Sequence, residues 1–98
     1  MPRPSLRVRR IRAAEDADVA AELSAALEAR WSESGLESLD VDAHALTVAG
    51  MYAAMATEEE VAAYLRGVEG RAGAPDADDV ALAAALLRIV LRLDAPDP

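Results

Sequence analysis

The most apolar stretch of the chain, residues 76–93, predicts a helix that needs neighbours on several sides. Placed at about 100° per residue, its large apolar side chains do not form one stripe but cover most of the circumference: Val80, Leu82, Leu86, Leu87, Ile89, Val90, Leu91 and Leu93. Asp76 follows Pro75 and is a good N-cap. The stretch is too short to span a bilayer, and Arg88 and Arg92 interrupt it. We therefore expect either the centre of a bundle or the seam of an oligomer.

Residues 15–31 predict an amphipathic helix. Their large apolar residues share one face, with acidic residues opposite: Val19, Leu23, Leu27 and Trp31. Gly35 favours a stop soon afterwards, because glycine readily adopts the left-handed conformation that ends helices. We expect the apolar face to pack against the helix of residues 76–93.

Residues 42–56 also fit helical spacing, and Asp42 can cap the helix that they predict. The pattern is ambiguous, because Leu46, Val48 and Tyr52 lie at even spacing and weak helix formers stand between them. A helix is the main interpretation, and a strand over residues 44–52 remains the alternative.

The clearest local signal begins at Thr57. Thr57 and Glu60 have the spacing of a capping box, in which each side chain accepts a hydrogen bond from the other residue's backbone amide. An apolar stripe with helical spacing follows: Val61, Tyr64, Leu65 and Val68. Gly70 can end this helix, and residues 70–75 predict a turn that leads into the last one.

The first thirteen residues differ from the rest in charge. They hold five arginines and no acid: Arg3, Arg7, Arg9, Arg10 and Arg12. Residues 14–98 hold the other five arginines and all eighteen acids, a net charge of −13. Leu6 and Val8 alternate with arginines, which is a strand pattern, but Ile11 breaks it. A short edge strand or extended arm and a flexible tail are equally compatible with this segment.

These elements predict an all-α fold, a compact four- to five-helix bundle over residues 14–94. A basic arm or short strand, residues 1–13, precedes it, and a disordered tail, residues 95–98, follows it. The chain has no phenylalanine and no cysteine, so the core must be mostly aliphatic and cannot contain a disulfide. The absence of cysteine, of a signal-peptide pattern and of lysine suggests a cytoplasmic protein encoded by a GC-rich bacterial genome.

Candidate chemistry is sparse. Asp40, Asp42 and His44 could share a helix face, but one histidine and two carboxylates make a poor metal site. The acids at residues 58–60 and 76–79 are explained by the preference of helix N-termini for negative charge. No glycine pattern suits a phosphate, and the lone histidine has no evident serine partner. We therefore expect no catalytic residue, no cofactor and no metal.

Residues 6–27 resemble the opening strand and helix of the large family of N-acetyltransferases that use acetyl-coenzyme A. The resemblance implies a strand over the arginine-rich segment. It covers under a quarter of the chain, and the Gly-rich turn by which that family binds acetyl-coenzyme A has no counterpart here. It therefore carries no function over to this chain.

The resulting hypothesis is a non-catalytic protein–protein interaction module: an adaptor, an accessory subunit or an immunity-type binder. We expect it to form a homo-oligomer through the helix of residues 76–93 and to have no contact with membranes. The candidate interaction residues are Arg7, Arg9, Arg10, Arg12, Trp31, Leu82, Leu86, Ile89 and Leu93. The alternative is a nucleic-acid-associated regulator that uses the arginine arm. It is disfavoured because the acidic body would repel phosphates and the arm has no aromatic residue to stack on bases.

Overall fold

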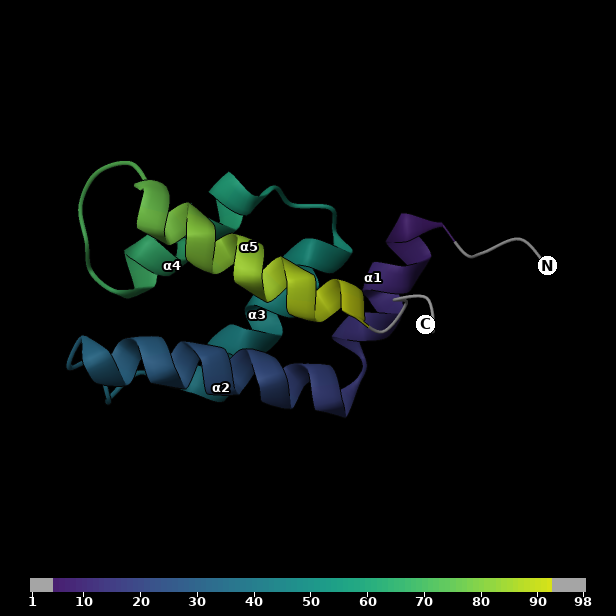
Figure 1. The fold of residues 1–98 in the computed structure, drawn as a ribbon, viewed down its shortest axis with the longest axis horizontal. Helices are drawn as coiled ribbons and strands as arrows, with labels where there is room; N and C mark the ends of the chain where they lie inside the picture. The colour runs from purple at the N-terminus through teal and green to yellow at the C-terminus, as the bar shows by residue number, and fades with distance from the viewer. Residues whose placement is uncertain (1–4, 93–98) are drawn as a thin grey trace.

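The computed structural model describes residues 5–92, which form five α-helices packed as one bundle (Figure 1). In chain order they are α1 (Leu6–Ala14), α2 (Ala17–Glu33), α3 (Val41–Ala53), α4 (Glu58–Val68) and α5 (Ala77–Leu91). The predicted all-α bundle is confirmed. Leu93 and the predicted tail, residues 95–98, lie outside the described residues. Within residues 5–92, every helix is too short or too polar to cross a bilayer.

The prediction of a strand or extended arm over residues 5–13 was wrong, because these residues form α1. The Ser5 side chain accepts a hydrogen bond from the Val8 amide and caps the helix. Arg10 and Ala13, one turn apart, are buried, whereas Val8 and Ile11 are exposed. The apolar alternation was misleading because the most apolar residues of this segment are not the ones that pack inward. The resemblance to an opening acetyltransferase strand fails for the same reason.

The strand alternative for residues 44–52 was also wrong, and α3 confirms the helical interpretation. Its buried residues have helical spacing: Ala45, Val48, Ala49 and Tyr52. Leu46, which contributed to the strand-like pattern, is 58% exposed. Small alanines at two of the buried positions leave room for α1 and α2, both of which pack against α3.

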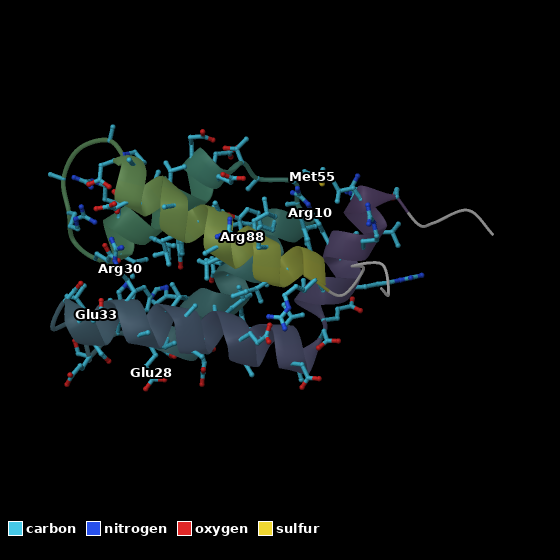
Figure 2. All side chains as sticks on the ribbon, in the orientation of Figure 1. Arg10, Glu28, Arg30, Glu33, Met55 and Arg88 are labelled. Carbon is cyan, nitrogen blue, oxygen red and sulfur yellow. The ribbon has the colours of Figure 1, made fainter. Side chains whose placement is uncertain are left out.

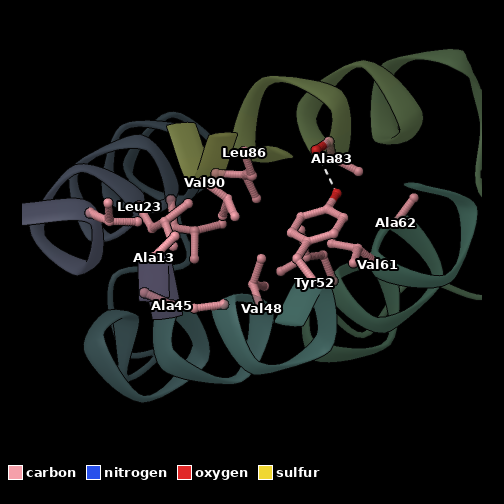
Figure 3. Close-up of a cluster of buried hydrophobic side chains, with 14 of the residues drawn as sticks. Ala13, Leu23, Ala45, Val48, Tyr52, Val61, Ala62, Ala83, Leu86 and Val90 are labelled. Carbon is pink, nitrogen blue, oxygen red and sulfur yellow. Dashed lines mark hydrogen bonds between the residues drawn. The ribbon is translucent and has the colours of Figure 1, made fainter. Parts of the chain in front are cut away.

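Helix α5 contacts all four other helices, as its apolar circumference required. Leu86, Ala83 and Val90 are fully buried on it (Figure 3). The Tyr52 hydroxyl of α3 donates a 2.6 Å hydrogen bond to the Ala83 carbonyl in this core (Figure 3). Burial, reinforced by the charge of Glu58, raises the pKa of Tyr52 above its ordinary value, so the hydroxyl stays protonated and keeps donating.

Three helices end in the same hydrogen-bonded turn, the Schellman motif. After α2 and α4 the residue in the left-handed conformation is glycine, Gly35 and Gly70, each with φ of +74°. After α3 it is Met55, with φ of +67°. The motif is intact there, because the Met55 amide donates to the Tyr52 carbonyl and the Ala56 amide to the Met51 carbonyl. Met55 therefore holds a strained conformation that glycine would adopt freely.

Leu86→Ala should lower the free energy of unfolding by about 2–5 kcal/mol, because it opens a cavity in the centre of the core. Chemical denaturation monitored by circular dichroism measures this loss. Leu46→Ala is the matched control, since the same atoms are removed from an exposed site and the change should stay within about 0.5 kcal/mol. Equal effects of the two substitutions would contradict the central position of α5.

Met55→Gly should raise the free energy of unfolding by about 0.5–1 kcal/mol, because glycine relieves the left-handed strain. The reverse experiment is Gly35→Ala, where a Cβ would meet nothing within 4 Å, so only backbone strain changes. This control should lose about 1 kcal/mol. A destabilised Met55→Gly variant would show that the Met55 side chain contributes more to packing than its backbone strain removes.

Candidate protein-interaction site

Within residues 5–92, the large hydrophobic side chains that the bundle leaves exposed are concentrated on α1. Three of these five are Leu6, Val8 and Ile11, which are 36%, 39% and 40% exposed. The other two, Leu46 and Met55, lie on α3 and at its end. One nine-residue helix therefore presents three partly exposed aliphatic side chains.

The outward side of α1 combines these apolar residues with charge. Val8 and Ile11 are one turn apart, with Arg12 one turn after Val8 and Arg7 one turn before Ile11. Among residues 5–92, neither Arg7 nor Arg12 forms an ion pair or a side-chain hydrogen bond. We call these four residues, Arg7, Val8, Ile11 and Arg12, the α1 outer face.

The other two arginines of α1 turn toward the bundle. Arg10 is only 9% exposed, and its guanidinium lies 6.0 Å from the centre of the Tyr52 ring. One of its terminal nitrogens donates a 3.3 Å hydrogen bond to the Tyr52 carbonyl. The Nε atoms of Arg10 and Arg9 are buried without a partner in the described residues. Figure 2 shows Arg10 beside Met55, and both line a cavity of about 390 Å³.

A network of charged side chains lies at the N-terminal end of α5. Its carboxylates are Glu69 and Asp79, whose side chains are 3% and 4% exposed. Arg66 and Arg71 each donate a 2.7 Å hydrogen bond to Asp79, and Arg71 also binds Glu69 at 3.2 Å. Arg30 of α2 reaches Asp79 at 3.4 Å. The network joins α2, α4 and α5.

Asp79 is both a member of this network and a capping residue. Burial by itself would raise its pKa, but the hydrogen bonds from the Asp76 amide, Arg66 and Arg71 outweigh burial and lower the pKa to about 2. Asp76 and Asp79 form a reciprocal capping box at the start of α5. The predicted N-cap at Asp76 is therefore confirmed, and so is the capping box at Thr57.

Three ring side chains, Trp31, His44 and Tyr64, lie next to this network. The indole of Trp31, which is buried, donates a 2.8 Å hydrogen bond to Glu69. The His44 ring meets Trp31 edge-on at 5.6 Å, and its Nδ1 lies 2.6 Å from the Tyr64 hydroxyl. The Trp31 indole, the Nδ1 atom of His44 and the Tyr64 hydroxyl all have partners within the bundle, so these side chains help to hold α2, α3 and α4 together.

An acidic groove opens where α2 ends and α3 begins, with a volume of about 470 Å³. Four carboxylates line it: Glu28, Glu37, Asp40 and Asp42. Its apolar lining includes Trp31, Leu36, Leu39 and Val41. Asp40 is the N-cap of α3 and accepts a hydrogen bond from the Ala43 amide. Within residues 5–92 the other three carboxylates form no ion pair or hydrogen bond.

The fold exposes some of the predicted interaction residues and buries others. Arg7 and Arg12 are exposed, Arg9 is half-buried, and Arg10, Trp31 and Leu86 are buried. Leu82 and Ile89 are partly buried and pack against the core, and Leu93 lies outside the described residues. Val8 and Ile11 were missed, although their place between arginines is visible in the sequence once α1 is known to be a helix.

The residues considered as metal ligands are used otherwise, Asp40 as a helix cap and His44 against Tyr64. Within residues 5–92 no group of three or more histidine, aspartate or glutamate side chains is placed to hold a metal ion. No protein-family model, curated protein or solved structure matches the chain.

Asp79→Asn should lower the free energy of unfolding at neutral pH by on the order of 2 kcal/mol, because a carboxylate whose pKa falls from 3.8 to about 2 stabilises the folded state by that amount. A lowered folded-state pKa stabilises the protein above pH 3.8, and this contribution disappears as the pH falls toward 2. The wild-type stability should therefore drop in that window, with a shallower drop in the variant. Denaturation at a series of pH values measures both slopes, and identical slopes would contradict the role of Asp79.

Proposed function

We propose that this chain is a non-catalytic protein-interaction module that binds its partner through the α1 outer face. The observation that carries the proposal is the concentration of exposed aliphatic side chains on α1, flanked by Arg7 and Arg12. Protein-binding surfaces combine an apolar centre with a polar rim, and arginine is enriched in them.

A protein partner is favoured over nucleic acid because of how α1 folds. Five arginines on a free arm could all have reached phosphates, but Arg10 is buried and Arg9 is half-buried. Of the arginines in the described part of α1, only Arg7 and Arg12 remain exposed. The net charge of −13 on residues 14–98 would repel both nucleic acid and an anionic bilayer.

A binding role is favoured over catalysis by the use of the ionisable groups. The buried carboxylates Glu69 and Asp79 accept hydrogen bonds from arginines and backbone, and the ring of His44 pairs with Tyr64. An active site needs such groups directed at a space where a substrate can enter. Here the buried carboxylates and His44 are paired inside the bundle and stabilise it.

Self-association through α5 stays a prediction, but the packing of α5 gives it little support. Pairing of two copies through α5 would need an uncovered apolar strip, whereas Leu82, Leu87 and Ile89 are partly buried against the core. Among the described residues of α5, those exposed beyond its first turn are Ala81, Arg88 and the capping Arg92. The α1 outer face is the better candidate surface.

Because the chain has no cysteine, a photocrosslinker can be attached at a single introduced cysteine. Val8→Cys places it on the α1 outer face, and Ala21→Cys places it on the exposed side of α2 as the matched control. In cells that encode the chain, protein adducts should form at position 8 and not at position 21. They should decrease at least about tenfold when Arg7→Glu and Arg12→Glu are added.

Mass spectrometry identifies the adducts, and titration calorimetry with the purified partner then measures the affinity with and without the two arginine substitutions. Equal adducts at both positions, or none at position 8, would contradict the proposed surface. Adducts that contain nucleic acid at position 8 would favour the regulator alternative.

A further inference from the structure

We infer that the α1 outer face binds the acidic groove of a second copy of this chain. The inference rests on the proposed function, since it assigns a partner to the same surface. It follows from three features of the described residues: complementary charge, complementary polarity, and the positions of the two surfaces on the molecule.

The charges of the two surfaces are opposite, and within residues 5–92 they are uncompensated. Arg7 and Arg12 stand on either side of the exposed apolar pair on α1. In the groove, Glu28, Glu37 and Asp42 form no ion pair or hydrogen bond. Arginine and carboxylate pair favourably at interfaces because the planar guanidinium matches the two carboxylate oxygens.

The surfaces also match in polarity. Val8 and Ile11 are exposed between the arginines, and the groove has an apolar lining between its acids that includes Leu36 and Leu39. Its volume of about 470 Å³ is in the range of pockets that enclose small ligands, so it can take side chains from one turn of a helix. Contact between these surfaces would cover apolar groups on both sides while opposite charges meet at the rim.

The positions of the two surfaces require two molecules. Helix α1 precedes α2, and the groove is built from the later part of α2, the following loop and the start of α3. The seventeen residues of α2 span about 25 Å, so the surfaces lie toward opposite ends of a rigid helix (Figure 1). Because α1 cannot reach the groove of its own bundle, the match can be satisfied only between copies.

Such a contact joins different surfaces on the two copies. It yields a reciprocal pair when two copies exchange both contacts, and a ring or an open row when each copy binds the next. Exposed ion pairs are individually weak and are screened over about 8 Å at physiological ionic strength. The association should therefore be strongest at low salt and weaken as salt is added.

Charge reversal at each surface tests the contact. Arg7→Glu with Arg12→Glu reverses α1, and Glu28→Arg with Glu37→Arg reverses the groove. All four residues are exposed, and none is a helix cap, so both variants should remain folded by circular dichroism. Ile11→Ala removes an apolar group of the contact without changing charge.

Sedimentation velocity at high micromolar concentration and low salt should show concentration-dependent association of the wild type. Each reversed variant, and Ile11→Ala, should associate at least about tenfold more weakly. An equimolar mixture of the two reversed variants should regain association, and so should one chain that carries all four reversals. Arg88→Glu and Glu33→Arg are controls on exposed residues outside both surfaces and should behave as wild type.

A wild type that stays monomeric at low salt would overturn the inference, as would association that survives the reversals or a mixture that fails to restore it. The cross-linking experiment separates this failure from failure of the proposed function. If position 8 cross-links in an arginine-dependent way to a different protein, the α1 outer face remains the binding surface and only the identity of the partner changes.

Discussion

Two buried carboxylates, Glu69 and Asp79, determine how three of the five helices meet. Arg30 of α2, Arg66 of α4 and Arg71 of the following loop converge on them, and Asp76 completes the group. Three positive and three negative side chains leave the group neutral, and the burial of Glu69 and Asp79 is tolerable because arginines pair with them. Loss of one partner leaves an uncompensated buried charge, which destabilises a protein far more than loss of an exposed ion pair. The packing of α5 at this end therefore depends on residues from distant parts of the sequence.

That dependence explains which features could be predicted. The capping residues Thr57 and Asp76 were visible because their partners lie three positions away. The buried network was not, because Arg30 and Asp79 are 49 positions apart and only the fold brings them together. The central place of α5 was predictable because a helix apolar on most sides has few alternatives in a single domain.

The error at α1 has a different physical origin. Periodicity identifies a helix when its apolar residues are the buried ones, but α1 buries Arg10 and Ala13 and exposes Val8 and Ile11. The segment thus has an inverted pattern, in which part of the apolar surface faces outward. A sequence method that assumes an apolar interior misreads such a segment. The same inversion leaves exposed on α1 the aliphatic side chains on which the proposed binding surface rests.

The placement of Trp31 gives the protein a built-in optical reporter. It is the only tryptophan in the chain, so intrinsic indole fluorescence arises from one site. Its ring is 1% exposed, donates a hydrogen bond to Glu69 and meets the His44 ring edge-on. The surroundings of the indole therefore depend on how α2, α3 and α4 pack together. It also lines the acidic groove from the inside. The emission of this one residue should therefore report the integrity of the core, and a ligand bound in the groove would lie beside the same ring.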